Sequence, residues 1–170
     1  WREAATDGVW RNGAVSDRKL AYDYGEPFTL PNHPVVGVTW YEALAFTRWL
    51  NEALAAAGAL PAGWRARLPS EAEWEKAARG TDGRTYPWGE ELTPQHANYD
   101  KTGIKTTNAV GCFPLGTGPH RSEEMSGNVW EWTASQQKAY PYTPHDGRER
   151  LDGGIDAGRV LRGGSVYHLV

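Results

Sequence analysis

Mostly apolar residues recur at helical spacing in one long stretch of this chain. The positions that repeat at steps of three and four are Ala43, Phe46, Thr47, Leu50 and Leu54. Such a stripe predicts an amphipathic helix that ends at Gly58. Thr39 and Glu42 form a capping box, in which each side chain accepts a hydrogen bond from the other residue's backbone N–H. The helix is therefore expected to begin directly after Thr39.

A second, shorter helix is predicted by the stretch RLPSEAEWEKAARG, residues 67–80. Ser70 and Glu73 repeat the capping-box spacing, Pro69 prevents an earlier start, and Gly80 suits the left-handed residue after a helix end. A helix of about ten residues is too short to be stable alone, so it is expected to dock on the rest of the fold.

Short segments of β character lie before and after these helices. Residues 35–38 form a β-rich run. SGNVWEWTAS, residues 126–135, alternates in polarity and predicts a strand. GRVLRGGSVYHL, residues 158–169, predicts a second strand that Gly163-Gly164 interrupts. Helices followed by short strands in long loops are typical of an α+β fold, which we expect as a single domain over residues 1–170.

The composition supports an ordered, loop-rich domain. Among 170 residues there are 9 Trp, 8 Tyr, 20 Gly and 11 Pro, and such aromatics can hold loops in place. The net charge of −3, without a basic helical face, predicts no nucleic-acid partner. No apolar run approaches the ~20 residues of a membrane span. Cys112 is the only cysteine, and the N-terminus lacks a signal-peptide pattern. Both observations favour the cytoplasm. The chain begins at Trp1 and not at a methionine, so the sequence leaves open whether a targeting segment precedes it.

Five motifs carry a family resemblance. HPVVGVTWYEALAFTRWL, RLPSEAEWEKAARG, YPWG, SGNVWEWTAS and RVLRGGS occur in this order over roughly residues 31–167. The series resembles the formylglycine-generating-enzyme (sulfatase-modifying factor) family, which implies a variant of the C-type-lectin-like fold with two helices on a small twisted antiparallel sheet. Members of the family continue after Gly-Gly-Ser, so the resemblance also implies a domain cut short at its C-terminus.

The resemblance leaves three kinds of function open. Formylglycine-generating enzymes are copper oxidases that hold copper(I) with two cysteines. Sulfoxide synthases use the fold beside an iron-binding helical domain. Variable proteins of diversity-generating retroelements use the fold to bind ligands. The first copper cysteine would stand three residues after Ser165, where this chain has His168. Cys112 belongs to a different motif, VGCFPLG, and the histidines show no metal-ligand spacing. These departures count against an oxidase.

The same resemblance implies calcium. Carried over position by position, the ligands of one site are the side chains of Glu124 and Glu131 and the carbonyls of Gly127 and Val129. Hard oxygen ligands are those that calcium prefers. A second, weaker site would use Asn98 and the carbonyl of Tyr99.

From the sequence we therefore expect a non-catalytic module that binds a protein or a small-molecule ligand, with a retroelement-diversified variable protein as one form of it. Its expected binding residues are Trp88, Val166, Tyr167 and His168. The alternative is an oxidative enzyme, either a formylglycine-generating copper oxidase or a sulfoxide synthase.

Overall fold

The computed structural model describes residues 22–152 and 157–168, and its internal contacts divide the chain into two compact units. Of the described residues, unit 1 comprises 22–24 together with Val35–Leu68, and unit 2 comprises Gly25–Pro34 with 69–152 and 157–168. Within the described residues, no helix is long and apolar enough to cross a membrane.

Unit 1 is built on helix α2, Trp40–Ala56. The predicted capping box is confirmed, because Thr39 Oγ1 accepts from the Glu42 N–H at 3.2 Å and Glu42 Oε2 accepts from the Thr39 N–H at 2.6 Å. After the helix, the chain folds back along it, and the side chain of Asn51 exchanges two hydrogen bonds with the backbone of Ala66 at 2.7 and 2.8 Å. The β-rich run at 35–38 does not form a strand.

Unit 2 contains helix α3, Glu71–Arg79, and its predicted boundaries are confirmed. Ser70 Oγ accepts from the Glu73 N–H at 3.2 Å, and Gly80 follows the helix with a φ of +69°. The helix docks as expected: the Glu71 N–H donates to Ser135 Oγ at 2.8 Å, which joins the start of α3 to the sheet.

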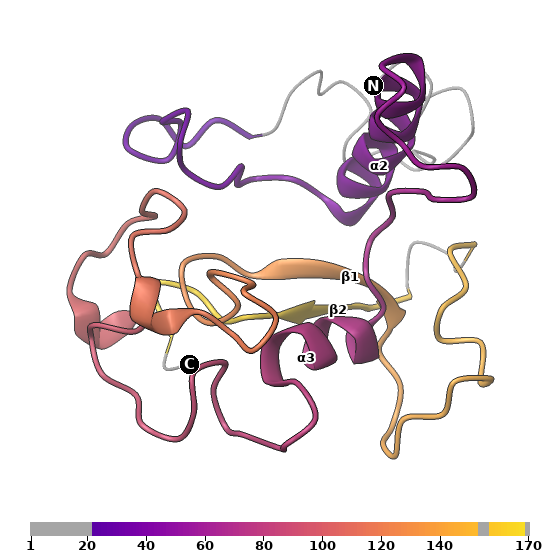
Figure 1. Cartoon of the computed structure of the whole chain (residues 1–170). Helices are drawn as coiled ribbons and strands as arrows, with labels where there is room; N and C mark the ends of the chain where they lie inside the picture. The colour runs from indigo at the N-terminus through magenta and orange to yellow at the C-terminus, as the bar shows by residue number, and fades with distance from the viewer. Residues whose placement is uncertain (1–21, 153–156, 169–170) are drawn as a thin grey trace. The chain divides into compact units, whose positions relative to one another are not determined.

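The sheet of unit 2 has two antiparallel strands, β1 (Glu131–Gln136) and β2 (Arg159–Arg162). Figure 1 shows α3 running alongside this strand pair. Both strands lie where the sequence predicts them, but they are shorter. Residues 126–130 and 163–168 are loops, because backbone angles φ of +59° to +92° at Gly127, Asn128 and Gly163 do not fit a strand. Residue 169 lies outside the described residues.

Most of unit 2 consists of ordered loops with a polar interior. Asn98 Nδ2 donates to Asn108 Oδ1 at 2.7 Å, and the Asn108 N–H donates to Asn128 Oδ1 at 3.2 Å. All three asparagines are buried. Their amides provide the hydrogen bonds that buried loop backbone cannot obtain from a sheet.

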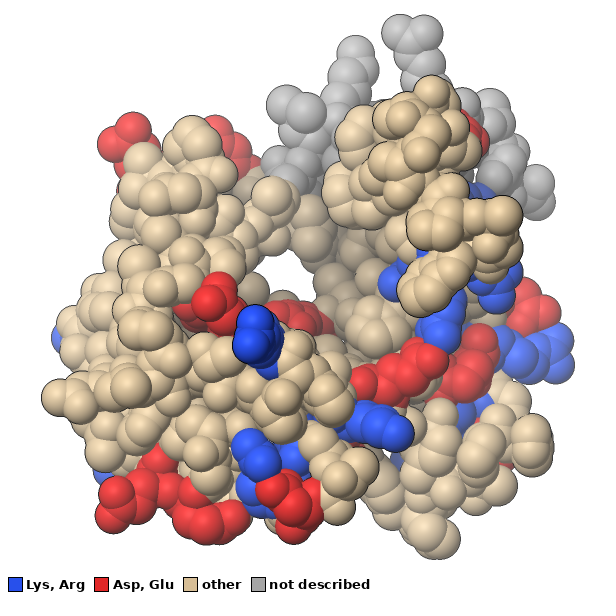
Figure 2. Space-filling view, in the orientation of Figure 1, with Lys and Arg blue, Asp and Glu red and all other residues tan. Residues whose placement is uncertain are grey.

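Charged side chains of both signs lie interspersed on the face shown in Figure 2. The described residues visible there form no extended basic patch.

Candidate functional site

The segment that follows β2 turns back into unit 2 through two glycines. Gly163 and Gly164 have φ values of +92° and +77°, a region that L side chains rarely adopt. The Gly163 carbonyl accepts from the Gly127 N–H at 2.7 Å, and the Val166 N–H donates to the Asn128 carbonyl at 3.1 Å. Two backbone hydrogen bonds thus fix this turn against the loop before β1, with Ser165 held between them in a buried position.

Ser165, His168 and Trp130 meet at this turn, and we call them the His168 cluster. Ser165 Oγ and His168 Nδ1 are hydrogen-bonded at 2.7 Å. The rings of His168 and Trp130 pack edge to face with centroids 5.4 Å apart, and Trp130 is 44% exposed. A hydroxyl and an imidazole in contact can hold or pass a proton, beside an indole on which a substrate can stack. The sequence indicates His168 through its motif but misses Ser165 and Trp130 as its partners.

Glu124 lies in the strained loop before β1, and its carboxylate accepts three long hydrogen bonds from amide groups. It accepts from the Gly111 N–H at 3.2 Å and from the side-chain amides of Asn108 and Asn128 at 3.4 and 3.3 Å. Its own φ is +58°. Burial raises the pKa of the Glu124 carboxyl, and the hydrogen bonds only partly oppose this effect.

Glu131 lies at the start of β1, and burial likewise raises the pKa of its carboxyl. The hydrogen bond from Trp74 Nε1, 2.6 Å long, lowers that pKa, while the negative charge of Glu124 raises it. Glu124 and Glu131 are partly buried carboxylates that repel one another, and neither has a basic partner among the described residues. A bound cation would stabilise such a pair. The residues therefore fit the predicted calcium site, which stays a prediction.

Asn98, the main residue of the second predicted calcium site, is fully buried. Its amide nitrogen donates to the Thr106 carbonyl at 2.8 Å and to Asn108, whereas its Oδ1 atom has no hydrogen-bond partner among the described residues. The Tyr99 carbonyl accepts from the Thr102 N–H at 2.9 Å. An orphaned buried oxygen fits a cation ligand. This site, too, stays a prediction.

The predicted ligand-binding residues lie in two separate places. The Trp88 ring is stacked between Tyr86 and His96, at centroid distances of 5.3 and 4.9 Å, which fixes its loop. Val166 is buried, whereas Tyr167 is 61% exposed and donates to the Lys105 carbonyl at 3.2 Å. Among the described residues, no hydrogen bond or ring contact joins Trp88 to residues 166–168.

The residues present do not fit a copper(I) site with two thiolates. His168 stands at the first ligand position and is bonded to Ser165, and the free Cys112 lies exposed in a turn. No group of three His, Cys, Asp or Glu side chains suited to a metal ion occurs in residues 22–152 and 157–168.

The sequence model of the sulfatase-modifying factor enzyme 1-like domain matches residues 5–170. The chain belongs to this family. The formylglycine-generating enzyme of Streptomyces coelicolor is 38% identical over 79% of this chain and 42% of its own length. The hercynine oxygenase of Mycobacterium tuberculosis is 36% identical over 92% of this chain and 34% of its own length. The structure of PvdO from Pseudomonas aeruginosa matches with a TM-score of 0.54 and 27% identity, over 80% of this chain and 51% of PvdO.

These relatives confirm the α+β, C-type-lectin-like fold of the family and correct the expected function. The interpretation as a non-catalytic binding module is wrong, because formylglycine-generating enzymes and hercynine oxygenases are both oxidative enzymes. The matches give no support to a retroelement origin. The chain spans less than half the length of either curated relative named above.

Proposed function

We propose that this sulfatase-modifying-factor-like domain is part of an oxidative enzyme of the hercynine oxygenase type. The observation that carries the proposal is His168, which stands in place of the first copper thiolate and is hydrogen-bonded to Ser165. The similarity to the Mycobacterium tuberculosis hercynine oxygenase, which extends over 92% of the chain, supports the same choice.

The chain's own residues would hold the substrate and a proton. Trp130 offers a half-exposed aromatic surface on which a flat ring can stack and exclude water. The Ser165–His168 pair offers a hydroxyl and an imidazole within hydrogen-bonding distance, so that a proton at Nδ1 or Oγ can be held or exchanged. An iron ion, which in the sulfoxide-synthase branch of the family belongs to a neighbouring helical domain, would supply the activation of dioxygen.

The proposal predicts oxygen uptake that depends on hercynine. The protein that carries this chain, supplied with ferrous iron, hercynine and cysteine in air, is expected to consume oxygen and hercynine together, measured with an oxygen electrode and by mass spectrometry. His168→Ala should lower kcat by about 100-fold, because a positioned acid–base group contributes roughly 10²–10⁴ to a rate. His145→Ala, which changes an exposed loop histidine, serves as the control and should leave kcat unchanged.

A parallel assay with copper(I) and a cysteine-containing sulfatase peptide separates the two oxidative chemistries. Formation of a peptide aldehyde without consumption of hercynine would contradict the proposal and favour formylglycine generation.

We further propose that calcium binds at Glu124 and Glu131, with the carbonyls of Gly127 and Val129, and at Asn98 with the Tyr99 carbonyl. The raised carboxyl pKa values and the orphaned Asn98 Oδ1 support this proposal. One millimolar calcium should raise the thermal midpoint by several degrees relative to EDTA, because an ion bound only by the folded state stabilises it. Glu124→Gln should reduce this shift, and Glu123→Gln, at the exposed neighbour, should not. An identical midpoint in calcium and EDTA would argue against both sites.

A further inference from the structure

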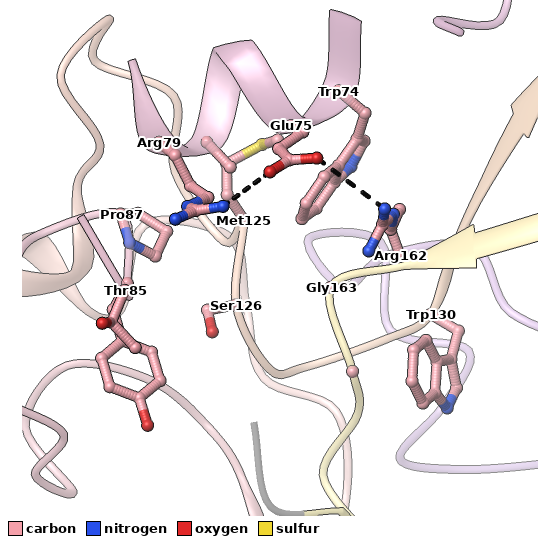
Figure 3. A pocket seen from close by; sticks show the side chains of 13 residues that line it. Trp74, Glu75, Arg79, Thr85, Pro87, Met125, Ser126, Trp130, Arg162 and Gly163 are labelled. Atoms are coloured by element: carbon pink, nitrogen blue, oxygen red, sulfur yellow. Dashed lines mark hydrogen bonds and ion pairs between the residues drawn. The ribbon is translucent and has the colours of Figure 1, made fainter. Parts of the chain in front are cut away.

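A pocket of about 390 Å³ opens in unit 2 beside α3. Figure 3 shows Trp74, Glu75 and Arg79 reaching into it from the helix, while Trp130, Arg162 and Ser126 line it from the strands and loops. We call this cavity the Arg162 pocket. Its walls combine indole surfaces with a small number of charged groups, a combination typical of sites for small organic ligands.

The acidic groups in and behind the pocket are already paired. The Glu75 carboxylate lies between two guanidinium groups, 2.6 Å from Arg79 Nη1 and 3.9 Å from Arg162 Nη2. The buried Glu71 carboxylate accepts from Arg162 Nη2 at 2.5 Å and from the Tyr140 hydroxyl at 2.7 Å. A cationic ligand would have to compete with these arginines for every carboxylate.

Hydrogen-bond donors, in contrast, remain without partners. Arg162 Nε is buried and has no hydrogen-bond acceptor among the described residues. The Ser126 hydroxyl faces the same space in Figure 3 and forms no hydrogen bond within the described part of the chain. Because Glu71 and Tyr140 fix the guanidinium of Arg162 at Nη2, the position of this planar group is held beside the pocket that Arg162 lines. The polar groups of the pocket that still lack a partner are therefore hydrogen-bond donors, and a ligand that pairs with them must supply hydrogen-bond acceptors.

We propose that the Arg162 pocket binds the carboxylate of a small aromatic acid. The carboxylate would accept from Arg162 and from the Ser126 hydroxyl, because a guanidinium presents planar donors that match two carboxylate oxygens. The ring would lie against the indoles of Trp74 and Trp130. This inference goes beyond the proposed function, because it requires no reaction and no metal, although the pocket shares Trp130 with the His168 cluster.

Equilibrium binding of benzoate and of its neutral isostere benzamide tests the proposal on the full chain. Titration followed by tryptophan fluorescence and by calorimetry should give a dissociation constant for benzoate at least about tenfold lower than for benzamide, since charge-assisted hydrogen bonds are roughly twice as strong as neutral ones. Arg162→Gln should abolish this preference. Arg150→Gln removes an exposed arginine that pairs with Asp152 outside the pocket, and should preserve it.

Arg162→Gln also removes a partner of Glu71, so Ser126→Ala provides a second variant that leaves the buried ion pair intact. It is expected to weaken benzoate binding about threefold without changing the thermal midpoint. Equal affinity for benzoate and benzamide, absence of binding at millimolar concentration, or a preference that survives in Arg162→Gln would each overturn the proposal. Since no turnover is measured, these outcomes are independent of the oxygen-uptake assay.

Discussion

Replacing Glu71 by alanine is expected to lower the free energy of unfolding by about 3–5 kcal/mol, the cost of removing one partner from a buried ion pair. The Glu71 carboxylate is bonded to Arg162 and Tyr140, and its second oxygen lies 3.9 Å from Nη1 of the fully buried Arg148. Without Glu71, the fully buried Arg148 and the partly buried Arg162 both lose a compensating charge. Chemical denaturation followed by circular dichroism measures the loss.

Glu75→Ala provides a matched control on the same helix. Glu75 is 39% exposed and pairs with Arg79 one turn later, and such surface pairs contribute only about 0.5 kcal/mol. A loss below about 1 kcal/mol for Glu71→Ala would show that the buried network does not hold α3 to the sheet.

Gly127→Ala is expected to destabilise the protein by about 2–4 kcal/mol. Gly127 has a φ of +86°, and an added Cβ would lie 2.4 Å from the carbonyl oxygen of Asn98. The left-handed backbone costs a residue with a side chain roughly 1–2 kcal/mol, and overpacking adds about 1–3. The loop that carries Glu124 and the bond to Gly163 would have to shift, so the stabilisation by calcium should decrease as well.

Gly83→Ala separates the two contributions. Gly83 has a φ of +75° with open space around its Cβ position, so only the backbone cost of about 1 kcal/mol is expected. Equal thermal midpoints for the two variants would contradict the close approach of Gly127 to Asn98.

Both helices could be predicted because their signals are local. Thr39 with Glu42 and Ser70 with Glu73 each specify a helix start within four residues, independently of tertiary structure. The strands could be located but not delimited. Asparagine tolerates a left-handed backbone, but SGNVWEW does not show that Asn128 adopts it. Hydrogen bonds to Asn98 and Asn108, which are 30 and 20 residues away in the chain, stabilise that conformation.

The candidate site could be predicted only in part, for the same reason. The motif places His168 at the family's metal position, but its neighbour Trp130 is distant in the chain and becomes apparent only in the fold. Arg162 and Glu71, which are 91 residues apart, show no sequence pattern that pairs them. The expected non-catalytic function is wrong because a missing copper thiolate does not by itself exclude other oxidative chemistry on the same fold. Some relatives of this chain are hercynine oxygenases and not formylglycine-generating enzymes.

The three buried asparagines of unit 2 have an evolutionary consequence. In a sheet, neighbouring segments are joined through main-chain groups, which survive nearly any amino-acid replacement. Here several hydrogen bonds between loops are made by the side-chain amides of Asn98, Asn108 and Asn128. A single nucleotide change that replaces one of these residues can therefore remove a hydrogen bond between loops that are distant in the chain. Divergence among descendants of this chain should therefore be slow at these three positions and fast in the exposed loop residues around them.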